Sequence, residues 1–161
     1  MDLSGKTITS ATLTFKNISN WDANTNRLFI HLLDTARNAI KATGITPGNR
    51  DVLFRAAHDM KGQAATFGFP QVAPVADSLC RLIEHTPDLD RIPYPLIDQH
   101  VDAVRAIIRE HSRPDAAATA EALTKKLRDV TDNFLLQVNR DRPDYVATVL
   151  SPPTAPNEGM F

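Results

Sequence analysis

Helical periodicity is clearest in the stretch LFRAAHDMKGQAATFG, residues 53–68. On a helical wheel with about 100° per residue, its apolar side chains fall within one arc about 100° wide. They are Leu53, Ala56, Ala57, Met60, Ala64 and Phe67. A helix with one apolar face buries that face against other elements, and Gly68 is a typical helix terminator. The stretch therefore predicts a helix that packs inside a multi-helix domain.

The segment before this helix shows the same spacing. Asn20 or Asp22 can cap a first helix, which Gly44 ends. After a turn at residues 47–48, Asn49 is expected to cap the second helix. The expected apolar positions of the first helix are Leu28, Leu32, Ala36, Ala39 and Ile40.

Three more amphipathic segments follow. Pro70 suits the first turn of a third helix, residues 87–95 read as a Pro-rich connector to a fourth, and Pro114 opens a fifth. The expected core positions are Val72, Val75, Ala76, Leu79, Leu82 and Ile83, then Ile97, Val101, Val104, Ile107 and Ile108, then Ala120, Leu123, Leu127, Val130, Phe134 and Val138. Five such segments without a convincing strand predict an all-α domain over residues 20–150, an antiparallel four-helix bundle with an additional helix.

The two ends of the chain differ from this pattern. Residues 1–19 are rich in Thr and Ser and form an N-terminal arm that either packs on the domain or is flexible. Residues 151–161 are Pro-rich, cannot continue a helix, and are expected to be a disordered tail.

Composition narrows the class of protein. The 161 residues are 42% hydrophobic and 23% charged, with a formal net charge of −1, which favours neither a nucleic-acid binder nor a membrane-surface binder. The single cysteine, Cys80, excludes an internal disulfide framework and is expected to be a buried apolar residue. The sequence has no run of apolar residues long enough for a membrane span. We expect a cytoplasmic protein.

His58 does not belong to the apolar arc of its helix. On the same wheel it points about 150° away from the middle of the arc, so its imidazole is expected near solvent. Imidazole is largely neutral at pH 7, and one ring nitrogen is then a usable nucleophile. Gly62 and Ala65 on the same face leave room for a bulky group, Phe54 suggests a surface that another protein covers, and Lys61 places a positive charge within one turn.

The run from His58 to Gly68 resembles the signature of histidine-containing phosphotransfer (HPt) domains of multistep two-component phosphorelays. In that signature a His is followed by Lys three residues on, by Gly four residues on and by a second Gly ten residues on. This chain has Lys61, Gly62 and Gly68 at those positions. Ala65 departs from the Gly or Ser that many members have, but it is also small.

The resemblance implies a function and a set of site residues. His58 would be the phosphoacceptor, Lys61 would stabilise the phosphoryl charge, and Gly68 would be structural. The partner-binding residues would be Phe54, Arg55, Gly62, Ala65 and Phe69.

The resemblance also implies the partners. Phosphoryl groups would pass between the receiver-domain aspartates of a hybrid histidine kinase and of a response regulator, with this chain as a monomeric carrier that has no kinase activity of its own. It would bind no cofactor, and Mg²⁺ would belong to the partner receiver domain.

Two alternatives remain open at this point. His58-Asp59-Met60-Lys61 also resembles the start of the phosphoacceptor box of dimeric histidine kinases, but that box has Pro where this chain has Gln63, and the motifs of the kinase ATP-binding domain are missing. The second alternative is a non-catalytic helical protein-interaction module.

The remaining polar residues give no second site. The other histidines, His31, His85, His100 and His111, are scattered and do not have the spacing of metal ligands, so we expect no metal site. No pair of acidic residues suggests acid–base catalysis.

Overall fold

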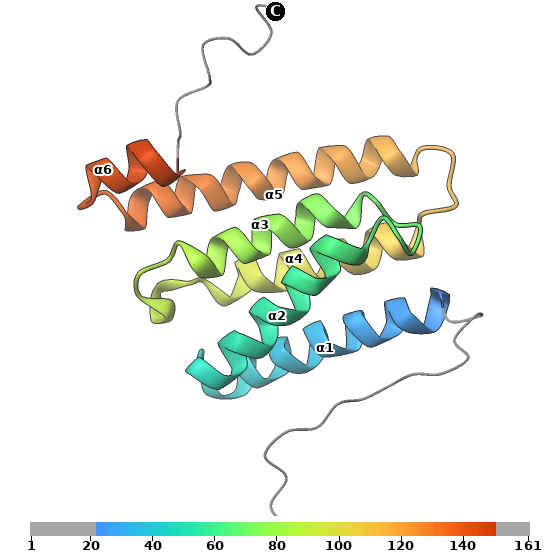
Figure 1. Ribbon diagram of the computed structural model, residues 1–161, viewed down its shortest axis with the longest axis horizontal. Helices are drawn as coiled ribbons and strands as arrows, with labels where there is room; N and C mark the ends of the chain where they lie inside the picture. The colour runs from blue at the N-terminus through green and yellow to red at the C-terminus, as the bar shows by residue number, and fades with distance from the viewer. Residues whose placement is uncertain (1–21, 151–161) are drawn as a thin grey trace, which may run out of the picture.

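The computed structural model describes residues 22–150, and the side chains from residue 30 onward; every regular element in this part is helical (Figure 1). The elements are α1 (Asp22–Thr43), α2 (Pro47–Gln63), α3 (Val72–Glu84), the 3₁₀ helix η1 (Leu89–Arg91), α4 (Tyr94–Arg109), α5 (Ala116–Val138), α6 (Pro143–Tyr145) and the π-helical segment η2 (Val146–Leu150). The expected arm, residues 1–19, and the expected tail, residues 151–161, lie outside the described residues.

Four helices form a closed bundle. Helix α1 contacts α2 and α4, and α3 contacts α2 and α4, while α5 packs across α3 and α4. Figure 1 shows α3 and α4 between α5 and the α1–α2 pair. The prediction of an all-α antiparallel four-helix bundle with an additional helix is therefore confirmed. None of the helices within residues 22–150 is long and apolar enough to cross a membrane.

Helix α2 begins earlier than the sequence suggested. Thr46, rather than Asn49, is the N-cap: its hydroxyl accepts a hydrogen bond from the Asn49 N–H at 3.2 Å, and the Asn49 side chain accepts one from the Thr46 N–H at 2.8 Å. Pro47 then occupies the first turn of the helix, where its missing N–H costs nothing. The reciprocal pair forms a capping box, which satisfies two N–H groups at the helix start.

The end of α2 lies close to the predicted one. The regular helix stops at Gln63, and turns continue the chain to Gly68. There the Phe69 N–H donates to the Ala64 carbonyl at 2.8 Å and the Gly68 N–H donates to the Ala65 carbonyl at 3.1 Å, the two bonds of a Schellman motif. Gly68 has a φ of +88°, a conformation that residues with a Cβ rarely adopt.

The core contains most of the predicted positions but differs in two helices. In α1 the predicted Ala36 and Ile40 are buried, but Leu33 is buried in place of Leu32, which is 36% exposed. In α5 Val130 is 44% exposed, while Thr131 and Leu135 are buried. The prediction missed Thr131 because a polar residue enters a core only with hydrogen-bond partners.

These partners form a buried polar cluster between α3, α4 and α5. The fully buried His100 donates from Nδ1 to the Leu96 carbonyl at 2.7 Å, and its Nε2 lies 2.9 Å from the hydroxyl of Ser78. The Thr131 hydroxyl lies 3.3 Å from that of Ser78. Burial lowers the pKa of His100, and its hydrogen bond to the Leu96 carbonyl offsets only part of the effect. The cluster thus joins three helices through a neutral imidazole.

The C-terminal elements α6 and η2 fold back onto the end of α5, where Leu150 packs with Leu135 and Val138. The side chain of Arg81 on α3 donates to the Leu150 carbonyl at 2.6 Å, and His85 Nδ1 lies 2.5 Å from the Tyr145 hydroxyl. None of the five helices predicted from the sequence includes α6 or η2, because three and five residues are too few to show a helical period.

Replacing His100 by Gln removes the buried titratable group and keeps a hydrogen-bonding side chain. In the unfolded chain His100 binds a proton near its ordinary pKa, about 6.5, whereas in the folded chain burial lowers this pKa. The buried neutral ring therefore contributes its full stability above about pH 6.5. This contribution is lost as the pH falls from there through the lowered pKa of His100 in the folded chain. We expect the free energy of unfolding, measured with urea between about pH 5 and pH 7.5, to fall less steeply for His100→Gln than for the wild type.

The matched control is His31→Gln, which replaces an exposed histidine of α1. It should keep the wild-type pH dependence. Equal slopes for His100→Gln and the wild type would contradict the burial of a neutral His100.

Candidate functional site

The imidazole of His58 lies on the outer face of α2. Its side chain is 66% exposed, whereas the neighbouring Ala57 and Met60 are buried. This is the direction that the helical wheel predicts. A nucleophilic ring in this position is open to a protein-sized partner.

An aromatic stack supports the ring. The rings of Phe54 and His58, one helical turn apart, lie 6.0 Å between centroids at an interplanar angle of 29°. Phe54 also packs against the core, and the guanidinium of Arg50 lies 5.5 Å from the centre of its ring on the same helix. The stack joins His58 to the body of the domain while leaving most of the imidazole exposed.

Asp59 is the nearest carboxylate to the ring among the described ion pairs. Its Oδ1 lies 3.9 Å from His58 Nδ1, which is too far for a hydrogen bond. The Asp59 carboxylate thus lies beside the ring without a hydrogen bond to Nδ1.

The face around His58 has open space. A Cβ added to Gly62 would meet nothing within 4 Å, and Gly62, Ala65 and Arg55 are exposed. Gly62 lies inside a helix and has no positive φ, so neither packing nor backbone conformation within the described residues requires glycine at this position. The absence of a side chain at Gly62 leaves space on the outer face of α2 for a group from another molecule.

Lys61, expected to stabilise the phosphoryl charge, makes an ion pair with a residue of another helix. Its ammonium lies 2.7 Å from Oδ1 of Asp77, which belongs to α3. This hydrogen bond, with the charge of Asp77, raises the pKa of Lys61. Burial acts to raise the pKa of Asp77, but hydrogen bonds from Lys61 and Arg128 outweigh it and the pKa is lowered.

Phe69 has a packing contact of its own. Its ring is partly buried and meets the ring of His111 edge to face, with 4.8 Å between centroids. His111 follows the end of α4, so Phe69 links the turn after α2 to that end of the bundle. Gly68, just before it, provides the left-handed turn that places Phe69 there.

The other histidines do not join the site. His85 pairs with Tyr145, His100 is buried, and His111 contacts Phe69. Among the described residues no group of three or more His, Cys, Asp or Glu is arranged to hold a metal ion.

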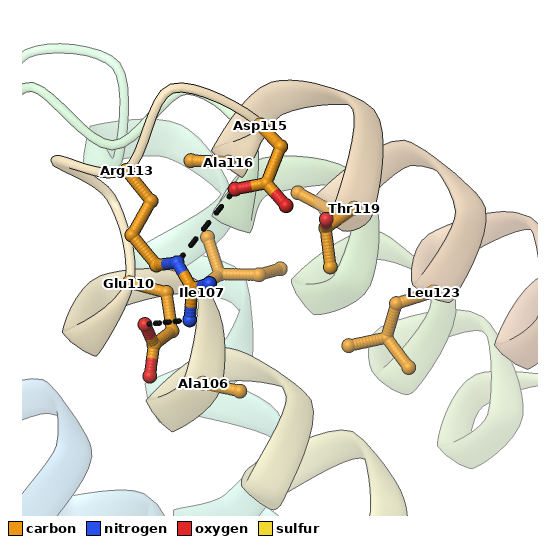
Figure 2. Close-up of a pocket in the computed structure, with 9 residues that line it drawn as sticks. Ala106, Ile107, Glu110, Arg113, Asp115, Ala116, Thr119 and Leu123 are labelled. Carbon is orange, nitrogen blue, oxygen red and sulfur yellow. Dashed lines mark hydrogen bonds and ion pairs between the residues drawn. The ribbon is translucent and has the colours of Figure 1, made fainter.

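A surface pocket of about 150 Å³ lies elsewhere, between the end of α4 and the start of α5 (Figure 2). Its lining is mainly apolar, from Ile107, Ala120 and Leu123 among others, and Arg113 pairs at its edge with Glu110 at 3.2 Å. No residue of the His58 face lines it.

Comparison with known families agrees with this geometry. The family model described as Hpt domain matches residues 28–133, from α1 to most of α5. The chain therefore belongs to the Hpt domain family, whose members carry out phosphotransfer in two-component signalling and interact with the receiver domains of phosphorelay proteins. Comparison with the curated proteins and with the solved structures gave no match.

Sequence reasoning missed two groups that belong to the site's surroundings. Asp77 holds Lys61, and Arg128 of α5 holds the other oxygen of Asp77 at 2.8 Å. Neither has a spacing relative to His58 that could identify it, because they reach α2 only through tertiary packing. The contact of Phe54 with His58, in contrast, follows from their i, i+4 spacing.

The open space at Gly62 leads to a stability prediction. Gly62→Ala should stabilise the protein by about 1 kcal/mol, because alanine is the better helix former and its Cβ meets no neighbour. Gly68→Ala, at a φ of +88°, should instead destabilise it. Urea unfolding of both variants checks this pair, and a loss of stability in Gly62→Ala would show that glycine is needed there for packing.

Proposed function

We propose that this chain is a phosphorelay intermediate in which Nε2 of His58 takes a phosphoryl group from a receiver-domain aspartate of a hybrid histidine kinase and passes it to that of a response regulator. The observation that carries the proposal is the exposed, stacked imidazole of His58 on a helix of an Hpt-family bundle. The signature spacing of Lys61, Gly62 and Gly68 after His58 supports it.

The transfer breaks one bond and forms one. The lone pair of Nε2 attacks the phosphorus of the receiver's aspartyl phosphate, the N–P bond forms, and the P–O bond to the carboxyl group breaks, so that the aspartate leaves as a carboxylate. The proton on Nδ1 stays in place, and the positive charge of the ring balances one negative charge of the phosphoryl group. Transfer to the next receiver reverses these steps. The attack requires the neutral tautomer in which Nδ1 carries the proton and Nε2 the lone pair.

The receiver would dock on the outer face of α2. Phe54 and Arg55 lie one turn before His58, and Gly62 and Ala65 lie one and two turns after it, so these residues surround the imidazole. Phe69, where the chain turns after α2, would lie at the edge of this surface. Small residues at 62 and 65 let the receiver's aspartyl phosphate approach the ring.

The positive charges that stabilise the phosphoryl group would come from both proteins. Lys61 is a cation of this chain within reach of a phosphoryl group on His58, since it lies three residues on along the helix. In this scheme the chain binds no cofactor and acts as a cytoplasmic monomer, while the Mg²⁺ needed at the aspartyl phosphate is held by the receiver.

His58→Gln should fold like the wild type, because His58 is exposed, and should fail to accept phosphate, because the glutamine amide has no nucleophilic nitrogen. The measurement is incubation with a ³²P-phosphorylated receiver domain, followed by a test for an acid-labile, alkali-stable label on this chain. His31→Gln, which replaces another exposed histidine, should be labelled normally. Uptake of label by His58→Gln would show that another residue is the acceptor.

Gly62→Leu should impair docking more than stability. The added side chain points into open space in this domain, so the fold accommodates it, but it occupies the space needed by a partner. We expect the receiver concentration for half-maximal transfer rate to rise at least about tenfold, which corresponds to about 1.4 kcal/mol of lost binding. Unchanged concentration dependence would place the docking surface elsewhere.

A further inference from the structure

Asp77 lies between two cations that come from different helices. Its Oδ1 is 2.7 Å from the ammonium of Lys61 on α2, and its Oδ2 is 2.8 Å from Nη1 of Arg128 on α5. Each carboxylate oxygen therefore has its own partner. If Lys61 left, Asp77 would keep one hydrogen-bonded cation.

Arg128 is itself held by a second carboxylate. Its Nε lies 3.8 Å from Oδ2 of Asp132, whose Oδ1 lies 3.0 Å from Nε of Arg81 on α3. The Asp77–Arg128 pair is thus part of a continuous set of charges across α3 and α5, whereas Lys61 is attached to that set at one point only.

Lys61 can leave Asp77 for another anion at a small cost in free energy. The side chains of Lys61 and Asp77 are 47% and 33% exposed, and ion pairs with this much solvent access contribute little to stability. A phosphoryl group on the neighbouring His58 would carry a charge close to −2 with several acceptor oxygens, whereas Asp77 offers a single negative charge already shared with Arg128. The phosphoryl group is the stronger competitor for the ammonium.

We propose that Asp77 is a positioning residue for Lys61: it holds the ammonium while His58 is unmodified and releases it to the phosphoryl oxygens once His58 is phosphorylated, with Arg128 remaining on Asp77. The inference rests on the proposed function in taking His58 as the phosphorylated residue and Lys61 as a cation that reaches its phosphoryl group. It adds a reciprocal relation, in which the strength of the Asp77 contact determines how strongly Lys61 stabilises the phosphorylated state.

Asp77 and the phosphoryl oxygens should then compete for the ammonium of Lys61, and this competition should change the proton affinity of the phosphoryl group. When Asp77 is replaced by Asn, the ammonium has no competing carboxylate and spends more time on the phosphoryl oxygens. The proton affinity of the phosphoryl group should then fall about two- to fivefold, the range that exposed ion pairs allow. In a Lys61→Gln background the same Asp77→Asn change should have no effect, because there is no ammonium to release.

The experiment uses the full chain labelled with phosphoramidate, a small phosphoryl donor, and follows the phosphorus resonance by ³¹P NMR as a function of pH. His58→Gln identifies the resonance of phospho-His58 by its loss. Four proteins form the cycle, namely the wild type, Asp77→Asn, Lys61→Gln and the double variant. Asp132→Asn is the matched control, since it removes a carboxylate of similar exposure that contacts Arg128 but not Lys61.

A fall in proton affinity for Asp77→Asn that disappears without Lys61, and that Asp132→Asn does not reproduce, supports the exchange. An equal shift with and without Lys61, an equal shift in Asp132→Asn, or no shift in Asp77→Asn overturns it and leaves the proposed function intact. A wild-type chain without a His58-dependent resonance would overturn both. Because no receiver domain is present, a failure of receiver transfer is a separate result.

Discussion

The burial of the apolar stripe of α2 against its neighbours is the constraint on which the site depends. Leu53, Ala57 and Met60 are almost completely buried, so the opposite side of the helix must face solvent. Rotating α2 to bury His58 would expose Leu53 and Met60 at a cost of about 2 kcal/mol each, and would also desolvate a polar ring. The outward direction of the imidazole is therefore a consequence of the core.

The ends of α2 fix the length over which this geometry holds. The capping box at Thr46 and Asn49 satisfies the first N–H groups, and the Schellman turn at Gly68 satisfies carbonyls at the other end. Between these caps the helix is regular enough for i, i+3 and i, i+4 neighbours to surround one side chain. A short-range sequence pattern can thus specify an exposed imidazole, an aromatic support in Phe54 and open space at Gly62.

The sequence could predict what depends on helical periodicity and could not predict what depends on packing between helices. The fold class, the buried stripe of α3 and the exposure of His58 follow from spacing within single helices. The choice of Leu33 over Leu32 in α1 and the burial of Thr131 and His100 depend on how the helices are rotated against one another. These rotations are set by neighbours that are distant in sequence.

The same distinction applies to the site's charges. Lys61 is identified by its position after His58, but its partner Asp77 is on α3, and Arg128, which holds Asp77, is on α5. Tertiary structure thus places the signature lysine on a carboxylate of another helix. The phosphoryl carrier would then contain a local cation whose availability is determined outside the helix that carries the histidine.

The central claim is that the outward imidazole of α2 receives the phosphoryl group. The most direct measurement is NMR of the chain with ¹⁵N-labelled histidine rings after transfer from a phosphorylated receiver domain, in which phosphorus–nitrogen coupling identifies the modified atom. We expect coupling to Nε2 of His58 and to no other histidine ring. Coupling at another histidine, or phosphate bound to a residue of another type, would contradict it.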